Sequence, residues 1–98
     1  MLKKSYSKTG KICRVTFKYV NEEGAESVAL AGDFNAWSTD STPMKKLKDS
    51  SFSVTLSLDA GSSYAFRYVI DGQSWVNDDM ADSYNPNEFG ENNSIVTV

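Results

Sequence analysis

Apolar and polar residues alternate along most of the chain with a period of two. The clearest run spans residues 52–58, where apolar side chains take turns with Ser and Thr. Such alternation predicts β-strands that bury one face and expose the other. No window of ten or more residues shows the period of an amphipathic helix. Strands are therefore expected at residues 11–20, 27–31, 52–58, 63–70 and 95–98, with residues 44–48 as a candidate for another.

Turn-forming residues separate these runs, among them Gly32-Asp33, where Asp33 is expected to be a turn residue. The pair Asp71-Gly72, between two apolar segments, is typical of a tight hairpin, because both central residues of a type I′ turn need a positive φ. Short strands at this spacing predict an all-β fold, an antiparallel β-sandwich of six to eight strands. Residues 1–10 are expected to form a loose N-terminal arm and residues 11–98 a single domain. A long polar loop is expected at residues 77–93, and loops of that length are usually functional.

Composition removes most catalytic chemistry. The 98 residues include no histidine and one cysteine, Cys13, which excludes His-dependent nucleophiles, His-based metal sites and multi-thiolate clusters. Glycoside hydrolysis needs two carboxyl groups about 5 to 9 Å apart across a bound sugar, and neighbouring loop carboxylates such as Asp78 and Asp79 are poor candidates. Calcium binding by the acidic residues near position 78 is a weak alternative, because their spacing differs from an EF-hand loop. We expect no enzyme activity, no metal and no cofactor.

Charge is distributed unevenly. The formal net charge is −3, yet residues 1–18 carry six basic and no acidic side chains, while residues 69–98 carry six acidic and no basic ones. The asymmetry indicates either two ends that neutralise each other in the fold, or a basic arm or a cation site. A nucleic-acid partner is not expected at this net charge, and no apolar run is long enough for a membrane helix. With a single thiol and no signal peptide, the expected location is cytoplasmic.

Two tryptophans stand outside the alternation. Trp37 follows the strand expected at residues 27–31, and Trp75 follows the Asp71-Gly72 turn. An indole has a flat apolar face and one N–H donor at its edge, which suits the C–H face and hydroxyl rim of a pyranose. The alternative is that each indole closes one end of the sandwich. Two tryptophans in expected loops of so small a domain favour a binding platform.

The segment VALAGDFNAW at residues 28–37 resembles the opening signature of the family 48 carbohydrate-binding modules. Further matching segments follow in the same order and spacing: PM at 43–44, FSVTLSL at 52–58, YAFRYVIDG at 64–72, Trp75, ND at 77–78 and FGENNSIVTV at 89–98. The family includes the glycogen-binding domain of the AMP-activated kinase β subunit and the N-terminal modules of isoamylases. Short free-standing bacterial members, called isoamylase N-terminal or early-set domains, are the most similar.

The resemblance implies an immunoglobulin-like, early-set β-sandwich that binds α-1,4-glucans. It also implies a role for five positions. Residues at the positions of Trp37 and Trp75 stack on consecutive glucose rings, those at Arg67 and Asn93 hydrogen-bond hydroxyls, and an apolar residue at Phe89 reaches through the bend of the glucan. All five residue types suit these roles.

The residues themselves partly support these roles. Arg67 falls on the polar side of its strand, and its planar guanidinium can bridge two hydroxyls, although it could equally be solvated or pair with a carboxylate such as Asp78. Asn93 offers a donor and an acceptor, but could simply be a turn residue. Phe89, in a polar segment, either packs inward or meets a ligand.

Some positions depart from the family. Glu91 stands where the kinase domains commonly carry a small hydroxyl residue, and Ser74 is an extra residue before Trp75.

Two functions are compatible with the sequence. The first is non-catalytic binding of an α-glucan such as glycogen, starch or maltodextrin. The alternative is a free-standing protein-interaction module that kept the fold and lost the sugar, with a glucan-processing enzyme or a second copy as its partner.

Overall fold

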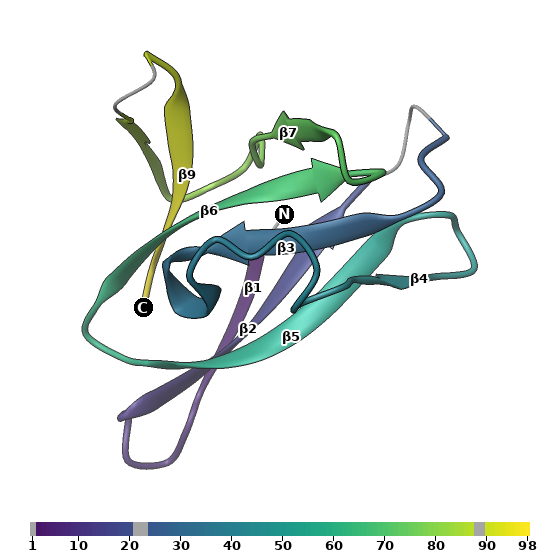
Figure 1. Cartoon of the computed structure of the whole chain (residues 1–98). Coiled ribbons are helices and arrows are strands. Elements are labelled where there is room, and N and C mark those ends of the chain that lie inside the picture. The colour runs from purple at the N-terminus through teal and green to yellow at the C-terminus, as the bar shows by residue number, and fades with distance from the viewer. Residues whose placement is uncertain (1, 21–23, 88–89) are drawn as a thin grey trace.

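The computed structural model describes residues 2–20, 24–87 and 90–98, and these form two antiparallel β-sheets (Figure 1). In order, the first sheet contains β1 (Leu2–Tyr6), β2 (Ile12–Tyr19), β5 (Phe52–Asp59) and β4 (Lys45–Lys46). The second contains β3 (Val28–Gly32), β6 (Ser63–Ile70), β9 (Asn92–Thr97) and β8 (Ser83–Pro86), with β7 (Ser74–Val76) also paired to β6. A short 3-10 helix, η1 (Asp33–Asn35), follows β3. The expected antiparallel, early-set β-sandwich is confirmed.

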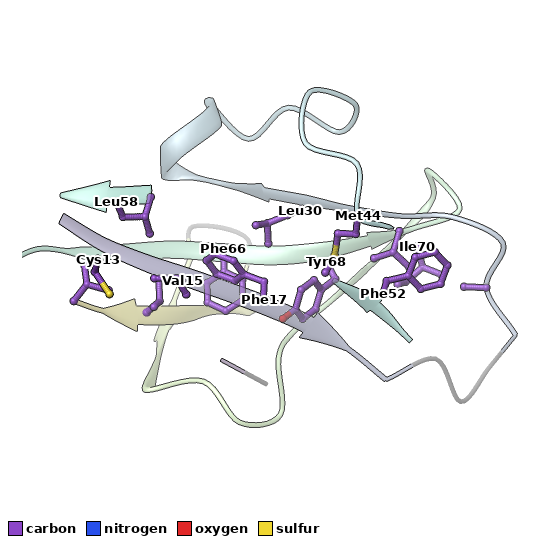
Figure 2. Close-up of a cluster of buried hydrophobic side chains, with 14 residues drawn as sticks. Cys13, Val15, Phe17, Leu30, Met44, Phe52, Leu58, Phe66, Tyr68 and Ile70 are labelled. Atoms are coloured by element: carbon purple, nitrogen blue, oxygen red, sulfur yellow. The ribbon is translucent and has the colours of Figure 1, made fainter. Parts of the chain in front are cut away.

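The core lies between the two sheets and is built from the inward faces of the alternating strands. Figure 2 shows Phe17 of β2 beside Phe66 and Tyr68 of β6. The rings of Phe17 and Phe66 meet edge to face, with centroids 5.0 Å apart and planes at 74°. Contacts of this kind add about 0.5–1.5 kcal/mol to the effect of apolar burial. Cys13 is fully buried in the same cluster, because it alternates with outward-facing residues in the same way as Val15 and Phe17.

The outward face of the second sheet carries the remaining buried apolar residues. On β6 the side chains of Phe66 and Tyr68 enter the core, so those of Arg67 and Val69 lie on the opposite face. Ala31 of β3 is the register partner of Arg67, and both Ala31 and Val69 are buried. Arg67 therefore lies next to buried apolar residues on this face of the sheet.

The N-terminal segment corrects one expectation. Instead of a loose arm, Leu2–Tyr6 form β1, which pairs with β2 from Leu2 opposite Phe17 to Tyr6 opposite Cys13. The sequence shows no clear alternation here because β1 is an edge strand. Of its residues, Leu2 packs against the core, while the backbone ladder with β2 and the ion pair between Lys4 and Asp82 add further contacts.

Described parts of the expected long loop form strands, which their polar composition does not indicate. Within residues 77–93, β8 and the start of β9 form a hairpin in which Asn85 pairs with Asn93. With β1, β7 and β8 added, the described residues form nine strands, against the expected six to eight. None of the described residues forms a helix with the length and hydrophobicity that a membrane crossing needs.

Candidate functional site

Gly32, the last residue of β3, lies where the chain packs too closely against β6 and Phe34 for a side chain to fit. A Cβ at this position would lie 2.5 Å from the carbonyl oxygen of Ala65 and 2.8 Å from the ring of Phe34. After η1, Ala36 and Trp37 both adopt left-handed backbone angles, with φ of 56° and 59°. The Trp37 N–H then donates to the Gly32 carbonyl at 2.9 Å, which closes the turn.

Asn35 holds this turn to the rest of the sheet. Its Oδ1 accepts from the Gly32 N–H at 3.0 Å, and its Nδ2 donates to the carbonyl of Leu30 at 2.8 Å and to Oγ1 of Thr42 at 3.0 Å. The side chain thus supplies partners for backbone groups that the sharp turn would leave without them. The segment GDFNAW is therefore a unit whose structural residues position Trp37.

Asp33 orients the indole of Trp37 directly. Its Oδ1 accepts a hydrogen bond from Trp37 Nε1 at 3.1 Å, while its Oδ2 accepts from the N–H of Ala65 in β6 at 2.9 Å. One carboxylate therefore links the ring to the neighbouring strand. Sequence reasoning assigned Asp33 only to a turn, although its place four residues before a tryptophan was the available signal.

Trp75 reaches the same face from the other side of β6. The Asp71-Gly72 turn has positive φ at both residues, 51° and 71°, and Gln73 N–H donates to Ile70 at 3.0 Å, as a type I′ turn requires. This turn brings β7 back along β6, with Trp75 opposite Val69. Trp75 is 37% exposed. The extra residue Ser74 is the first residue of β7.

The two indoles lie next to each other although their residues are far apart in sequence. Their ring centroids are 6.4 Å apart and their planes differ by 35°. The two rings are therefore adjacent and tilted relative to each other.

Arg67 of β6 is held at several points near Trp75. Its Nη1 forms an ion pair with Glu91 Oε2 at 2.8 Å, and its Nη2 donates to the carbonyl of Trp75 at 3.1 Å. The side chain is only 12% exposed, and its Nε is buried with no hydrogen-bond partner among the described residues. The acidic partner is thus Glu91 rather than Asp78.

Asn93 enters the site from β9. Its Oδ1 accepts a hydrogen bond from Asn87 Nδ2 at 3.3 Å. Asn87 in turn accepts the Glu91 N–H on its own Oδ1 at 3.1 Å. The carboxamides therefore connect the end of β8 to the segment that carries Glu91.

These side chains surround one pocket of about 750 Å³. Four of the five residues expected at a binding site line it, namely Trp37, Arg67, Trp75 and Asn93. Three more residues line it, namely Asp33, Asn87 and Glu91. Sequence reasoning had not placed Asp33 or Asn87 there, whereas the resemblance associates the position of Glu91 with a sugar contact that the glutamate puts in doubt. Phe89, the fifth expected residue, lies outside the described residues.

The acidic residue Asp78 has a structural position instead of a place in the pocket. It is 2% exposed, and its Oδ2 accepts a hydrogen bond from the buried Tyr68 hydroxyl at 2.6 Å. Burial, together with the charge of Asp78, raises the pKa of Tyr68 far above its ordinary value, so the hydroxyl stays a donor. Across residues 2–20, 24–87 and 90–98 no group of three or more His, Cys, Asp or Glu side chains is arranged to hold a metal ion.

Comparison with known families agrees with this architecture. Residues 13–98 match the model of the family described as the glycogen recognition site of AMP-activated protein kinase. The chain belongs to this family. The match begins at the first buried residue of β2 and includes every residue that lines the pocket. Comparison with curated proteins found no match.

Proposed function

We propose that this member of the glycogen-recognition family binds α-1,4-glucans without catalysis, at the pocket between Trp37 and Trp75. The observation that supports the proposal most is the convergence of two indoles, one guanidinium and two carboxamides on a single pocket of the second sheet. Aromatic faces with a few polar groups at their edges are what a sugar ring needs from a binding surface.

In the proposed complex each indole stacks on one glucose. The tilt of 35° between the rings suits consecutive units of an α-1,4-glucan, because such a chain turns from one residue to the next. Arg67 donates to sugar hydroxyls through its remaining Nη hydrogens, and Asn93 adds an amide donor. Glycogen, starch and maltodextrin share this repeating unit, so all three belong to the proposed ligand class.

Phe89 remains a proposed contact on the strength of the family resemblance. A cytoplasmic location is likewise retained from the sequence, in keeping with the single buried thiol of Cys13.

Titration with β-cyclodextrin, followed by tryptophan fluorescence, tests the proposal. We expect saturable quenching or enhancement, and at least a tenfold loss of affinity in Trp37→Ala and in Trp75→Ala, which is about 1.4 kcal/mol each. Tyr6→Ala is the matched control, since Tyr6 is an aromatic residue exposed to 54% on β1 of the other sheet. Amide chemical shifts are expected to change around residues 37, 67, 75 and 93.

A flat titration of the folded wild-type protein would refute glucan binding. It would favour the alternative, an interaction module whose partner is a protein. Retained affinity in both folded tryptophan variants would instead show that sugar binds elsewhere on the surface.

A further inference from the structure

The carboxylate of Glu91 occupies the place where an anionic ligand would meet Arg67. It lies 2.8 Å from Nη1, and it is the only anionic partner of Arg67 in the part of the chain that the structure describes. The Arg67 side chain is 12% exposed whereas that of Glu91 is 60% exposed. The charge that a ligand encounters first is therefore the negative one.

A second carboxylate strengthens this arrangement. Asp33 lines the same pocket, with its oxygens directed at Trp37 Nε1 and Ala65 N–H. Among the described lining residues, two carboxylates thus oppose one guanidinium, and the lining carries a formal charge of −1. An anion that enters the pocket meets net repulsion, although an arginine lies within it.

We propose that Glu91 determines the charge specificity of the site: it neutralises Arg67 so that the pocket accepts uncharged glucans and disfavours glucans that carry phosphate or carboxylate groups. The inference rests on the proposed function and adds to it a ligand class. Without Glu91, a largely buried guanidinium would attract phosphate, because planar bidentate pairing with such groups is what arginine does best.

The side chain of Glu91 can be changed without removing the contacts that shape its turn. Its backbone N–H donates to Asn87 Oδ1 and its carbonyl accepts from Asn87 N–H, and both bonds remain in any substitution except proline. Glu91→Gln keeps the length and a carbonyl acceptor for Arg67 while it removes the charge. Asp59→Asn removes the same charge from an exposed position on β5 of the first sheet and serves as the matched control.

Three probes separate charge from sugar recognition: β-cyclodextrin, its mono-6-phosphate and its mono-6-amino derivative. For the wild-type protein in low salt we expect the neutral and amino rings to bind more tightly than the phosphate. In Glu91→Gln the affinity for the phosphate ring, divided by the affinity for the neutral ring, should rise about tenfold. The affinity for the phosphate ring relative to the amino ring should rise as well. Salt at 0.5 M should reduce the differences in affinity between the charged and neutral rings, since partly exposed charges are screened.

An unchanged ratio in Glu91→Gln, or an equal change in Asp59→Asn, overturns the role of Glu91 and leaves glucan binding intact. A wild-type protein that prefers the phosphate ring overturns it as well. Failure of the neutral ring to bind the wild-type protein refutes the proposed function, and this inference with it. The relative affinities also distinguish specificity from a merely structural effect, which would weaken all three probes alike.

Discussion

The hydrogen bond between Tyr68 and Asp78 should contribute a large share of the stability of this small domain. Both side chains are almost fully buried, at 1% and 2% exposure, and their oxygens are 2.6 Å apart. A hydrogen bond to a charged group contributes about 1.5–3 kcal/mol, and in a domain of this size 1 kcal/mol shifts the melting temperature by roughly 4–8 °C. Tyr68→Phe should therefore lower the melting temperature by roughly 6–24 °C.

Urea denaturation of Tyr68→Phe, Asp78→Asn and the double variant measures the interaction itself. Asp78 also accepts the Met80 N–H at 2.8 Å, so Asp78→Asn alone should cost more than the loss of the tyrosine partner. The double-mutant cycle removes that difference, and we expect a coupling energy of about 1.5 kcal/mol or more. A coupling below about 0.5 kcal/mol, the usual limit of additivity for independent sites, would refute the reasoning.

The structural effect of losing this hydrogen bond should extend to the proposed binding site through the residues around Asp78. The Asp78 N–H donates to Ser94 Oγ at 2.9 Å, and Ser94 Oγ donates to Asn77 Oδ1 at 2.9 Å. These bonds join the segment after β7 to the residue next to Asn93. Amide shifts in Tyr68→Phe should therefore change along β7 as well as in the core, whereas Tyr6→Ala should leave β7 unaffected.

Three further predictions concern other parts of the fold. Gly32→Ala should destabilise the protein by about 1–3 kcal/mol or more, because the new Cβ would lie 2.5 Å from the Ala65 carbonyl oxygen; denaturation within 0.5 kcal/mol of wild type would contradict this. Burial alone would raise the pKa of Asp82, but hydrogen bonds from Lys4 and a backbone N–H, with the Lys4 charge, lower it. Since the pKa of Asp82 is lower in the folded state than in the unfolded state, the ion pair with Lys4 stabilises the fold above about pH 4 and loses this effect as the pH falls further. The difference in unfolding free energy between wild type and Lys4→Met should be at most about 1 kcal/mol at neutral pH and should vanish in acid. Deletion of residues 2–6 should lower the melting temperature yet leave β-cyclodextrin affinity within threefold, because β1 belongs to the other sheet; a larger loss would connect β1 to the site.

The long strands that bury one face were predictable from sequence, whereas most of the short or exposed strands were not. The expected segment 63–70 coincides with β6, and 52–58 differs from β5 by one residue, because both place alternate apolar side chains in the core. By contrast, every residue of β8 is exposed. Its pairing with β9 depends on backbone hydrogen bonds, which leave no hydrophobic pattern in the sequence.

The site shows the same division. Trp37 and Trp75 could be selected because aromatic residues at strand ends are conspicuous, and the resemblance added Arg67 and Asn93. The ion pair between Arg67 and Glu91 depends on how β6 and β9 align across 24 positions of sequence, which no local pattern reports. Asp33 was assigned to a turn, but its second role, orienting an indole, needs the left-handed backbone at Trp37 that only the structure shows.

The acidic stretch at residues 69–98 has more than one structural basis. Asp78 is buried against a tyrosine hydroxyl, Asp82 pairs with Lys4 of β1 at 2.6 Å, and Glu91 pairs with Arg67 inside the pocket. The expected neutralisation of the two ends thus applies to Asp82 and Lys4, which tie the edge of the first sheet to the second. It does not extend to Glu91, whose partner is central in the second sheet. The charge asymmetry of the sequence therefore combines a contact between the chain ends with an ion pair in the proposed ligand site, and only the ion pair should alter which of the proposed glucan ligands are bound.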